Sequence, residues 1–358
     1  MNILALNAGS SSLKFRIAEP GRAPLFTGTA QDFGTPDARL EIRNADGQAV
    51  QNTACAGLPD AARAVLDFAG ARKLRLSAIG HRIVHGGPRI LAHCVIDKRV
   101  EEALTQASAL APLHNPPALD VLALARQMYR DVPQIACLDT AFHSHLPPVA
   151  ARFPLPAHFF GEGIRRYGFH GLSCESILAQ LDPAPQRLVI AHLGGGASVT
   201  AVKGGISVDT TMGLTPDGGV IMETRSGDLD PGLLIYLLRQ GQTADTLEQL
   251  LSKKSGIAGI SQGSGDPRQL RASRTDDGDI ALDMFAISVA KAIAGMAAAL
   301  GGIDLLVFTG GIGEHDDSMR QNILVRLNWI ADLAIRILPA REEEMIIDHC
   351  GKLVSVRE

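Results

Sequence analysis

The chain has 358 residues, of which 46% are hydrophobic and 20% are charged, and its formal net charge is −4. This length and apolar content are sufficient for two packed domains and exclude a disordered polypeptide. The small net charge, with lysine and arginine scattered along the chain, argues against a nucleic-acid-binding surface and favours small-molecule partners.

The five cysteines are widely spaced and odd in number, without a C-x-x-C pair. This pattern predicts neither a disulfide framework nor a zinc site, and it fits a reducing compartment. The apolar stretch within residues 1–6 is too short for the core of a secretory signal, so we expect a cytoplasmic protein.

The first segment is predicted to form a strand, a tight turn and a second strand. Leu4 and Leu6 precede the sequence Asn-Ala-Gly-Ser, after which Leu13, Phe15 and Ile17 alternate with polar residues. A period of two indicates a β-strand. A Walker A loop would instead open a helix and end in Gly-Lys-Ser/Thr. Neither that sequence nor G-x-G-x-x-G occurs in the chain, which disfavours P-loop and Rossmann folds.

The same design returns at 188–202. There the apolar run Leu-Val-Ile-Ala-His-Leu reaches Gly194-Gly195-Gly196-Ala197-Ser198 and continues as Val-Thr-Ala-Val. Two such strand–turn–strand segments indicate an internal duplication. Their exposed backbone N–H groups can donate hydrogen bonds to polyphosphate oxygens from two sides, so the pair predicts an actin-like ATP-binding fold.

A third glycine-rich segment, 309–314, follows an expected strand at 305–308 and precedes an expected helix from about 316 to 327. We interpret this segment as a turn whose backbone amides contact a phosphate or a ribose.

The run 281–302 is rich in Ala, Ile and Met and is long enough to raise the question of a membrane span. Asp283 and Lys291 lie within it, and charged residues are rare in membrane-spanning helices. The sequence therefore predicts a buried core or interface helix and no membrane partner.

Seven motifs in order along nearly the whole chain resemble those of the acetate kinases, within the superfamily of acetate and sugar kinases, heat-shock chaperone ATPases and actin. The motifs are Asn7-Ala-Gly-Ser-Ser-Ser-Leu-Lys14, Gly80-His-Arg-Ile-Val-His-Gly-Gly87, Ala111-Pro-Leu-His-Asn-Pro116, Asp139-Thr-Ala-Phe-His143, Arg166-Tyr-Gly-Phe-His-Gly171, Thr224-Arg-Ser-Gly-Asp228 and Phe308-Thr-Gly-Gly-Ile-Gly-Glu314.

The resemblance implies an α/β fold with two actin-like domains, each built on a duplicated mixed β-sheet core of the ribonuclease H type flanked by helices. The expected domains are 1–145 together with 343–358, whose last helix crosses back, and 146–342. The second domain is expected to carry the nucleotide site and a homodimer interface.

The implied reaction is the reversible transfer of the γ-phosphoryl group of ATP to acetate, giving acetyl phosphate and ADP, with Mg²⁺ or Mn²⁺ as cofactor. ATP and a carboxylate are both anionic, so the site needs positive charge before they can approach each other. The family motifs assign this role to Arg82 and Arg225, helped by His114 and His170. A carboxylic acid of pKa about 4 to 5 is already ionised at pH 7 and needs no general base. Asp139 is therefore assigned to orienting Arg82 or a metal-bound water.

The resemblance also assigns the groups that bind metal and substrate. Asn7 and Glu342 are expected to supply metal-side oxygens, although the acidic triplet 342–344 could instead be the exposed start of a helix. A small apolar pocket is expected for the acetate methyl group. One methylene changes binding in such a pocket by only about 1–3 kcal/mol, so propionate is expected as well. The pocket residues are Val84, Leu113, Phe169 and Pro216.

Nucleotide contacts are expected from the three glycine-rich segments and from one further loop. Lys14 is the weakest member, because lysines on strands often face solvent. The full set is Ser10, Ser12, Lys14, His192, Leu193, Gly194, Gly195, Gly196, Asp266, Pro267, Arg268, Gly310, Gly311, Ile312, Gly313 and Glu314.

Three positions depart from the family pattern, and the chain is somewhat short. Gly195 replaces an Asn, Asp217-Gly218 replaces Leu-Glu, and Glu223 replaces a Gly. The first change removes a donor near the phosphates, and the last adds a carboxylate that could compete for Arg225. We hypothesise that backbone amides of the glycine run compensate. Two alternatives stay open: a propionate or other short-acyl kinase, and a catalytically weakened actin-like ATP-binding protein.

Overall fold

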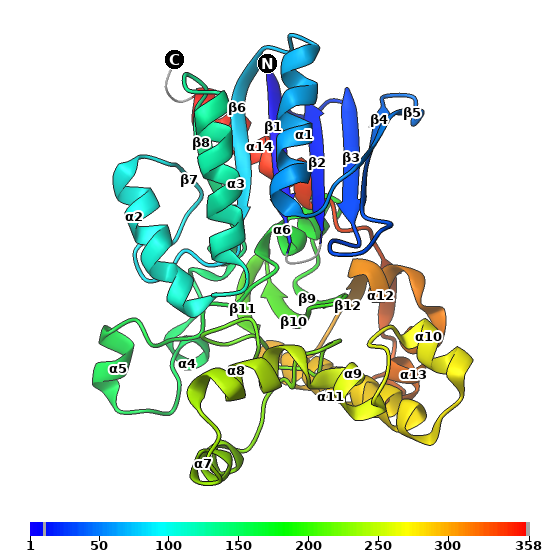
Figure 1. Cartoon of the computed structure of the whole chain (residues 1–358). Helices are drawn as coiled ribbons and strands as arrows, with labels where there is room; N and C mark the ends of the chain where they lie inside the picture. Colours follow the sequence, from blue (N-terminus) through cyan, green and yellow to red (C-terminus); the bar gives the residue numbers. More distant parts are fainter. Residues whose placement is uncertain (10–11, 356–358) are drawn as a thin grey trace. The chain divides into compact units, whose positions relative to one another are not determined.

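A computed structural model of the chain describes residues 1–9 and 12–355 and divides them into two compact units (Figure 1). Unit 1 consists of Met1–Ser144 and the chain from Arg341 onward, and unit 2 of His145–Ala340. Each unit is built on one mixed β-sheet.

The sheet of unit 1 has the strand order β5-β4-β3-β2-β1-β6-β8-β7. Strands β1 to β5 pair as successive antiparallel neighbours, whereas β1, β6 and β8 run parallel. The strands are β1 (Asn2–Ala8), β2 (Leu13–Ala18), β3 (Phe26–Gln31), β4 (Arg39–Asn44), β5 (Ala49–Ala54), β6 (Leu76–Ile83), β7 (Cys94–Val95) and β8 (Gln134–Leu138).

Helices cover both faces of the central strands of unit 1. On one face, α1 (Leu58–Ala71) and α3 (Asn115–Met128) bury Phe15, Leu40 and Leu66 in a continuous apolar core (Figure 1). On the other face, α14 (Glu342–Ser355) packs on β1 and β6. A side chain at Gly80 would clash with Ile346 and Cys350 of α14, so this glycine permits the close approach of the last helix to β6. A further helix, α2 (Lys98–Ala107), contacts α3.

The sheet of unit 2 has the order β11-β10-β9-β12-β13. Its strands are β9 (Arg187–Leu193), β10 (Ala197–Lys203), β11 (Ile206–Thr210), β12 (Leu305–Thr309) and β13 (Ala334–Ile337). The first three pair antiparallel, and β12 and β13 continue parallel to β9. The strands β3-β2-β1-β6-β8 of unit 1 have the same order and directions. The predicted duplication and the predicted fold class are therefore confirmed.

The longest helix of unit 2, α11 (Asp276–Leu300), is the core helix predicted from the run 281–302. Its buried side chains include Phe285, Val289 and Ile293, and it packs on β9 and β10. Among the helices in the described part of the chain, it alone is long and apolar enough to cross a membrane, with a mean hydropathy of 1.7 over 18 residues, half of them buried. One face of the helix packs on the sheet, whereas Ile280, Met284 and Ile287 are 52%, 41% and 42% exposed.

The other helices of unit 2 are short. They are α4 (Pro148–Ala151), α5 (Ala157–Gly161), α6 (Gly171–Ala179), α7 (Pro231–Arg239), α8 (Ala244–Lys253), α9 (Gly256–Ser261), α10 (Pro267–Ser273), α12 (Gly310–His315) and α13 (Asp317–Leu324). The expected helix after residue 316 is present as α13. The interpretation of 309–314 as a turn is wrong, because these residues form most of α12. Gly310 is the first residue of α12 and has φ +79°, a backbone conformation that favours glycine. A Cβ at this position would also clash with the backbone of Leu193.

Candidate active site

The centre of the predicted site in unit 1 is the ion pair of Arg82 and Asp139, a fork in which two nitrogens of the arginine donate to the two carboxylate oxygens. Arg82 lies near the end of β6, and Asp139 directly follows β8, so the parallel pairing of these strands brings the two side chains together. Arg82 Nε donates to both carboxylate oxygens at 3.1 and 3.0 Å, and Nη2 donates to Oδ2 at 2.6 Å. The Asp139 side chain is 1% exposed. Such a bidentate contact fixes the plane of the guanidinium group.

Asn7, at the end of β1, extends this fork to α14. Its Oδ1 accepts from Arg82 Nη1 at 3.2 Å, and its Nδ2 donates to Glu342 Oε2 at 2.8 Å and to Glu343 Oε1 at 2.6 Å. Glu342 is the first residue of α14 but is only 9% exposed. The alternative of an exposed helix start therefore does not apply to it. Sequence reasoning missed Glu343, whose only signal was its place in the acidic triplet.

Charge and burial act together on these groups. Burial alone would lower the pKa of Arg82, but the charges of Asp139 and Glu342 and the hydrogen bonds to Asp139 raise it above its ordinary value, so Arg82 stays a cation. Burial raises the pKa of Glu343, and the neighbouring charge of Glu342 raises it further, against the opposing effects of Lys14 and Asn7. Lys14 itself is exposed on β2.

The other residues predicted in unit 1 lie on the segments after β1 and β6 and at the start of α3. Val84 is buried, while Leu113 and His114 are partly buried just before α3. Asn115 joins these segments, because its Oδ1 accepts from His85 N at 3.1 Å and its Nδ2 donates to His85 O at 2.8 Å. On the first turn, Gly9 N donates to Ser12 O at 2.8 Å. Ser10 lies outside the described residues.

In unit 2, two histidines stack beside the second glycine turn. The rings of His170 and His192 are 4.1 Å apart at an angle of 18°. Each is oriented by a serine, His170 Nδ1 to Ser198 Oγ at 2.9 Å and His192 Nδ1 to Ser173 Oγ at 2.8 Å. Because each Nδ1 is engaged, Nε2 is the atom turned to the glycines. A Cβ on Gly196 would lie 3.3 Å from His170 Nε2.

Arg225 approaches the same turn from another loop. A Cβ on Gly196 would also lie 3.3 Å from Arg225 Nη1, and that atom donates to Pro216 O at 3.1 Å. Arg225 Nε lies 3.5 Å from Asp217 Oδ1, and the two side chains form an ion pair. The carboxylate expected to compete for Arg225 was that of Glu223, and the ion pair forms with Asp217 instead.

A hollow of about 360 Å³ in unit 2 adjoins the glycine turn. It brings together three segments expected to bind nucleotide: the turn itself, the start of α10 and the start of α12. Asp266 caps α10 by accepting from Arg268 N at 2.8 Å. The lining residues are Gly194, Gly195, Glu223, Gly265, Asp266, Pro267, Arg268, Gly311, Ile312, His315 and Asp316.

The remaining residues expected around the nucleotide adjoin this lining in sequence. Leu193 is buried at the end of β9, and Gly310 and Gly313 are buried in α12. Glu314 has a structural contact, since its Oε1 accepts from Gly310 N and from Ala340 N, both at 3.0 Å. This carboxylate therefore links the start of α12 to Ala340.

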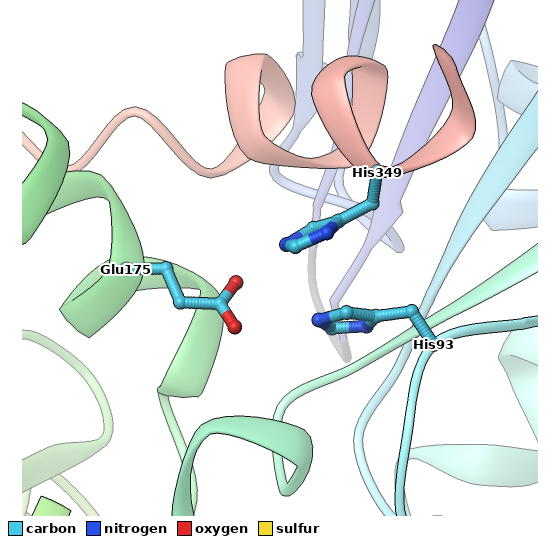
Figure 2. A group of neighbouring side chains, drawn as sticks. All are labelled: His93, Glu175 and His349. Atoms are coloured by element: carbon cyan, nitrogen blue, oxygen red, sulfur yellow. The ribbon is translucent and has the colours of Figure 1, made fainter. Parts of the chain in front are cut away.

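Two histidines of unit 1 that the sequence did not single out also stack. The rings of His93 and His349 are 3.8 Å apart, tilted by 34° (Figure 2). Leu138 N donates to His93 Nδ1 at 3.0 Å. In the neutral ring the proton of His93 is therefore on Nε2, which prevents that nitrogen from acting as a metal ligand in this arrangement.

The duplicated sheets, the glycine turns after the first strand of each, and the cationic residues beside them define the class of actin-like phosphotransferases. A model of the acetokinase family matches residues 2–354, and the chain belongs to this family. The resemblance inferred from the seven motifs is thus confirmed.

Relatives and solved structures agree with this assignment. An acetate kinase of Thermosynechococcus vestitus is 39% identical over 99% of both chains, and one of Deinococcus radiodurans is 43% identical over 99% of this chain and 96% of the relative. A propionate kinase of Francisella tularensis superposes with a TM-score of 0.88 at 32% identity, covering 97% of this chain and 98% of the other. The alignment with the Thermosynechococcus relative has 411 positions, whereas this chain has 358 residues. At least 53 aligned positions therefore have no residue in this chain.

Proposed function

We propose that this kinase transfers the γ-phosphoryl group of ATP to acetate, reversibly, with acetyl phosphate and ADP as products. The observation that carries the proposal is the fork between Arg82 and Asp139. The buried carboxylate of Asp139 binds one edge of the guanidinium group of Arg82, which stays charged. A carboxylate substrate is already ionised, so the enzyme needs no base of the kind that deprotonates an alcohol. This arrangement suits an acceptor that is already an anion.

In the proposed reaction the two arginines neutralise charge and the histidine contacts the moving group. A carboxylate oxygen of acetate forms a bond to the γ-phosphorus as the bond from that phosphorus to the bridging oxygen of ADP breaks. Arg82 and Arg225 hold the carboxylate and the phosphoryl oxygens, and His170 donates from Nε2 to an equatorial oxygen. His114 is proposed to help in the same way. Asp139 positions Arg82 and does not exchange a proton.

The acidic residues beside Asn7 fit a magnesium ion. Glu342 and Glu343 accept from the same amide nitrogen, so two carboxylates lie together, and burial first and the charge of Glu342 second raise the pKa of Glu343. We propose that Glu342, Glu343 and the second lone pair of Asn7 Oδ1 hold the ion. When bound, Mg²⁺ neutralises phosphate charge, and Mn²⁺ shares its preference for oxygen ligands.

The hollow of unit 2 is proposed to bind ATP and ADP. Backbone amides of Gly194–Gly196 would contact phosphate oxygens, and the segments at Asp266–Arg268 and Gly310–Glu314 would contact the nucleoside. Ser10, Ser12 and Lys14 are proposed to serve the phosphates from unit 1. Three consecutive glycines leave this turn without side chains, which supports the hypothesis that amides replace a side-chain donor.

Propionate is proposed as a second substrate. The apolar residues expected to receive the acyl group are Val84 and Leu113 of unit 1 and Phe169 and Pro216 of unit 2. Such a pocket discriminates weakly against one added methylene. The similarity to a solved propionate kinase supports this acceptor. The presence of Arg82, Asp139, His170 and Arg225 together argues against a weakened ATP-binding protein.

A homodimer formed through unit 2 is part of the proposal. All nine residues of α7 are at least partly exposed, although seven of them are apolar or aromatic. Ile235 is 50% and Tyr236 58% exposed, and an apolar patch of this kind marks an interaction site. Light scattering after gel filtration should give twice the chain mass for the wild type and a single chain mass for Ile235→Asp with Tyr236→Asp. A monomeric wild type would contradict the dimer. We also propose a cytoplasmic location, which the odd number and wide spacing of the cysteines support.

Trapping of acyl phosphate with hydroxylamine tests the function. The protein is incubated with ATP and Mg²⁺ and, separately, with formate, acetate, propionate or butyrate, and the hydroxamate formed is measured. Acetate should give the highest kcat/KM and propionate the next. Wild type that forms no hydroxamate with any acid, while still binding ATP, would support the weakened ATP-binding protein instead.

A further inference from the structure

Glu223 is a carboxylate that lies between two glycines of the hollow. A Cβ on Gly195 would be 2.9 Å from Glu223 Oε2, and a Cβ on Gly265 would be 3.1 Å from Oε1 and would clash with Cγ. All three residues line the hollow. The side chain therefore fills the space between the glycine turn and the segment that leads into α10, and it does so because neither glycine carries a Cβ.

The backbone fixes this position. Glu223 N donates to Gly195 O at 3.4 Å, and Glu223 O accepts from Ala258 N at 2.9 Å. These contacts join residue 223 to the turn on one side and to α9 on the other. The direction of the side chain is thus set by its backbone and by the space that the glycines leave.

The carboxylate of Glu223 has no ion-pair partner in the described part of the chain. Within residues 1–9 and 12–355, its carboxylate makes no hydrogen bond or ion pair. Three arginines near the hollow pair with other carboxylates: Arg268 with Asp266, Arg271 with Asp316, and Arg225 with Asp217. A ligand in this hollow therefore meets a partly buried negative charge beside the turn.

We propose that Glu223 determines which form of the nucleotide binds, selecting the divalent-cation complex over the metal-free polyphosphate. This inference rests on the proposed nucleotide site. A metal-free polyphosphate on the amides of Gly194–Gly196 would place its full negative charge next to Glu223 Oε2, in a site where water screens poorly. A divalent cation on the phosphates reduces that charge and so removes most of the repulsion.

Two other roles for the carboxylate lead to different results. A hydrogen bond from a ribose hydroxyl to Glu223 would make the carboxylate favourable for every form of the nucleotide. Direct coordination of the cation by Glu223 would make removal of the charge weaken the magnesium complex. Repulsion alone predicts that removal of the charge tightens binding of metal-free nucleotide and leaves the complex nearly unchanged.

The test is calorimetric titration of ADP, once with Mg²⁺ and once with EDTA, into the wild type, Glu223→Gln and Glu223→Ala. Glu248→Gln, an exposed residue of α8, is the matched control for loss of one negative charge. We expect both variants at 223 to bind metal-free ADP about tenfold more tightly than the wild type, and the magnesium complex within about twofold. The control should match the wild type in both conditions.

Unchanged or weaker binding of metal-free ADP by both variants overturns the inference, as does an equal gain in the Glu248→Gln control. Weaker binding of the magnesium complex would assign Glu223 to the cation or the ribose instead. A wild type that binds ADP in neither condition would overturn the nucleotide site itself, a result distinct from wild-type binding that the variants do not alter. Thermal unfolding of each variant confirms that the folded protein is titrated.

Discussion

Arg82 donates three hydrogen bonds to Asp139, whereas the ion pair between Arg225 and Asp217 is one 3.5 Å contact. The two aspartates also differ in exposure, since the side chain of Asp139 is 1% and that of Asp217 34% exposed. The pair of Arg82 with its aspartate is therefore the closer and more buried of the two.

Asp139→Asn should lower kcat for acetyl phosphate formation at least a hundredfold. The substitution keeps the shape of the side chain but removes the charge that fixes Arg82, and it leaves a buried guanidinium group without its ionic partner. The hydroxamate assay measures kcat and KM, and Asp120→Asn on the exposed face of α3 is the matched control. A value of kcat within threefold of the wild type would show that the fork does not position Arg82 for the reaction.

Asp217→Asn should have a smaller effect, about tenfold in kcat/KM, because the contact with Arg225 is longer and more exposed. Its Oδ2 also accepts from Ser252 Oγ at 3.1 Å, a bond that Asn can retain through its own oxygen. Steady-state kinetics with acetate and with ATP as the varied substrate measure the change. A loss as large as that of Asp139→Asn would mean that the two arginines are held with equal strength.

Local patterns in the sequence were enough for the architecture. The alternation of Leu13, Phe15 and Ile17 and the glycine turns that follow β1 and β9 are set by neighbouring residues, so both hairpins and their duplication could be predicted. The segment 310–315 was misinterpreted, because its glycines lower intrinsic helix propensity. Its helix depends on contacts beyond the segment, including the bond from Ala340 N to Glu314.

Contacts between distant segments were harder to predict. The pairing of Asp139 with Arg82 was anticipated as one of two roles, because a carboxylate substrate needs no general base. The position of Glu343 depends on the way α14 docks on β1, more than 330 residues away in sequence, which no local pattern encodes. The contact of Glu223 with Gly195 likewise depends on space left by two glycines on separate loops.

Glu343→Gln should stabilise the protein at pH 7–8. Burial raises the pKa of Glu343 in the folded state, so its stabilising contribution is present below the ordinary carboxyl pKa and is lost as the pH rises through the raised value. Gln cannot ionise and avoids this loss. Thermal unfolding without metal should show a midpoint roughly 2 °C above the wild type at pH 8 and equal to it at acidic pH.

Glu344→Gln is the control for this change, because its carboxylate is more exposed and pairs with Arg16 at 3.2 Å. It should be neutral or slightly destabilising at both pH values. Mg²⁺ should raise the midpoint of the wild type more than that of Glu343→Gln, since the variant lacks one proposed ligand. Equal stabilisation of both by Mg²⁺ would place the ion elsewhere.

His81 should make unit 1 sensitive to acid. Burial lowers the pKa of His81 to about 4, against the hydrogen bond to Gln134 and together with the charge of Arg126. Since the folded pKa lies below the unfolded value of about 6.5, this contribution is complete above pH 6.5 and is lost as the pH falls toward 4, up to about 3 kcal/mol. Urea unfolding of the wild type and His81→Gln at pH 7 and pH 4.5 measures it. The variant keeps a partner for Gln134 Oε1, at 2.7 Å in the wild type, and should lose less stability across this range. Equal losses in both proteins would assign the acid sensitivity to other groups.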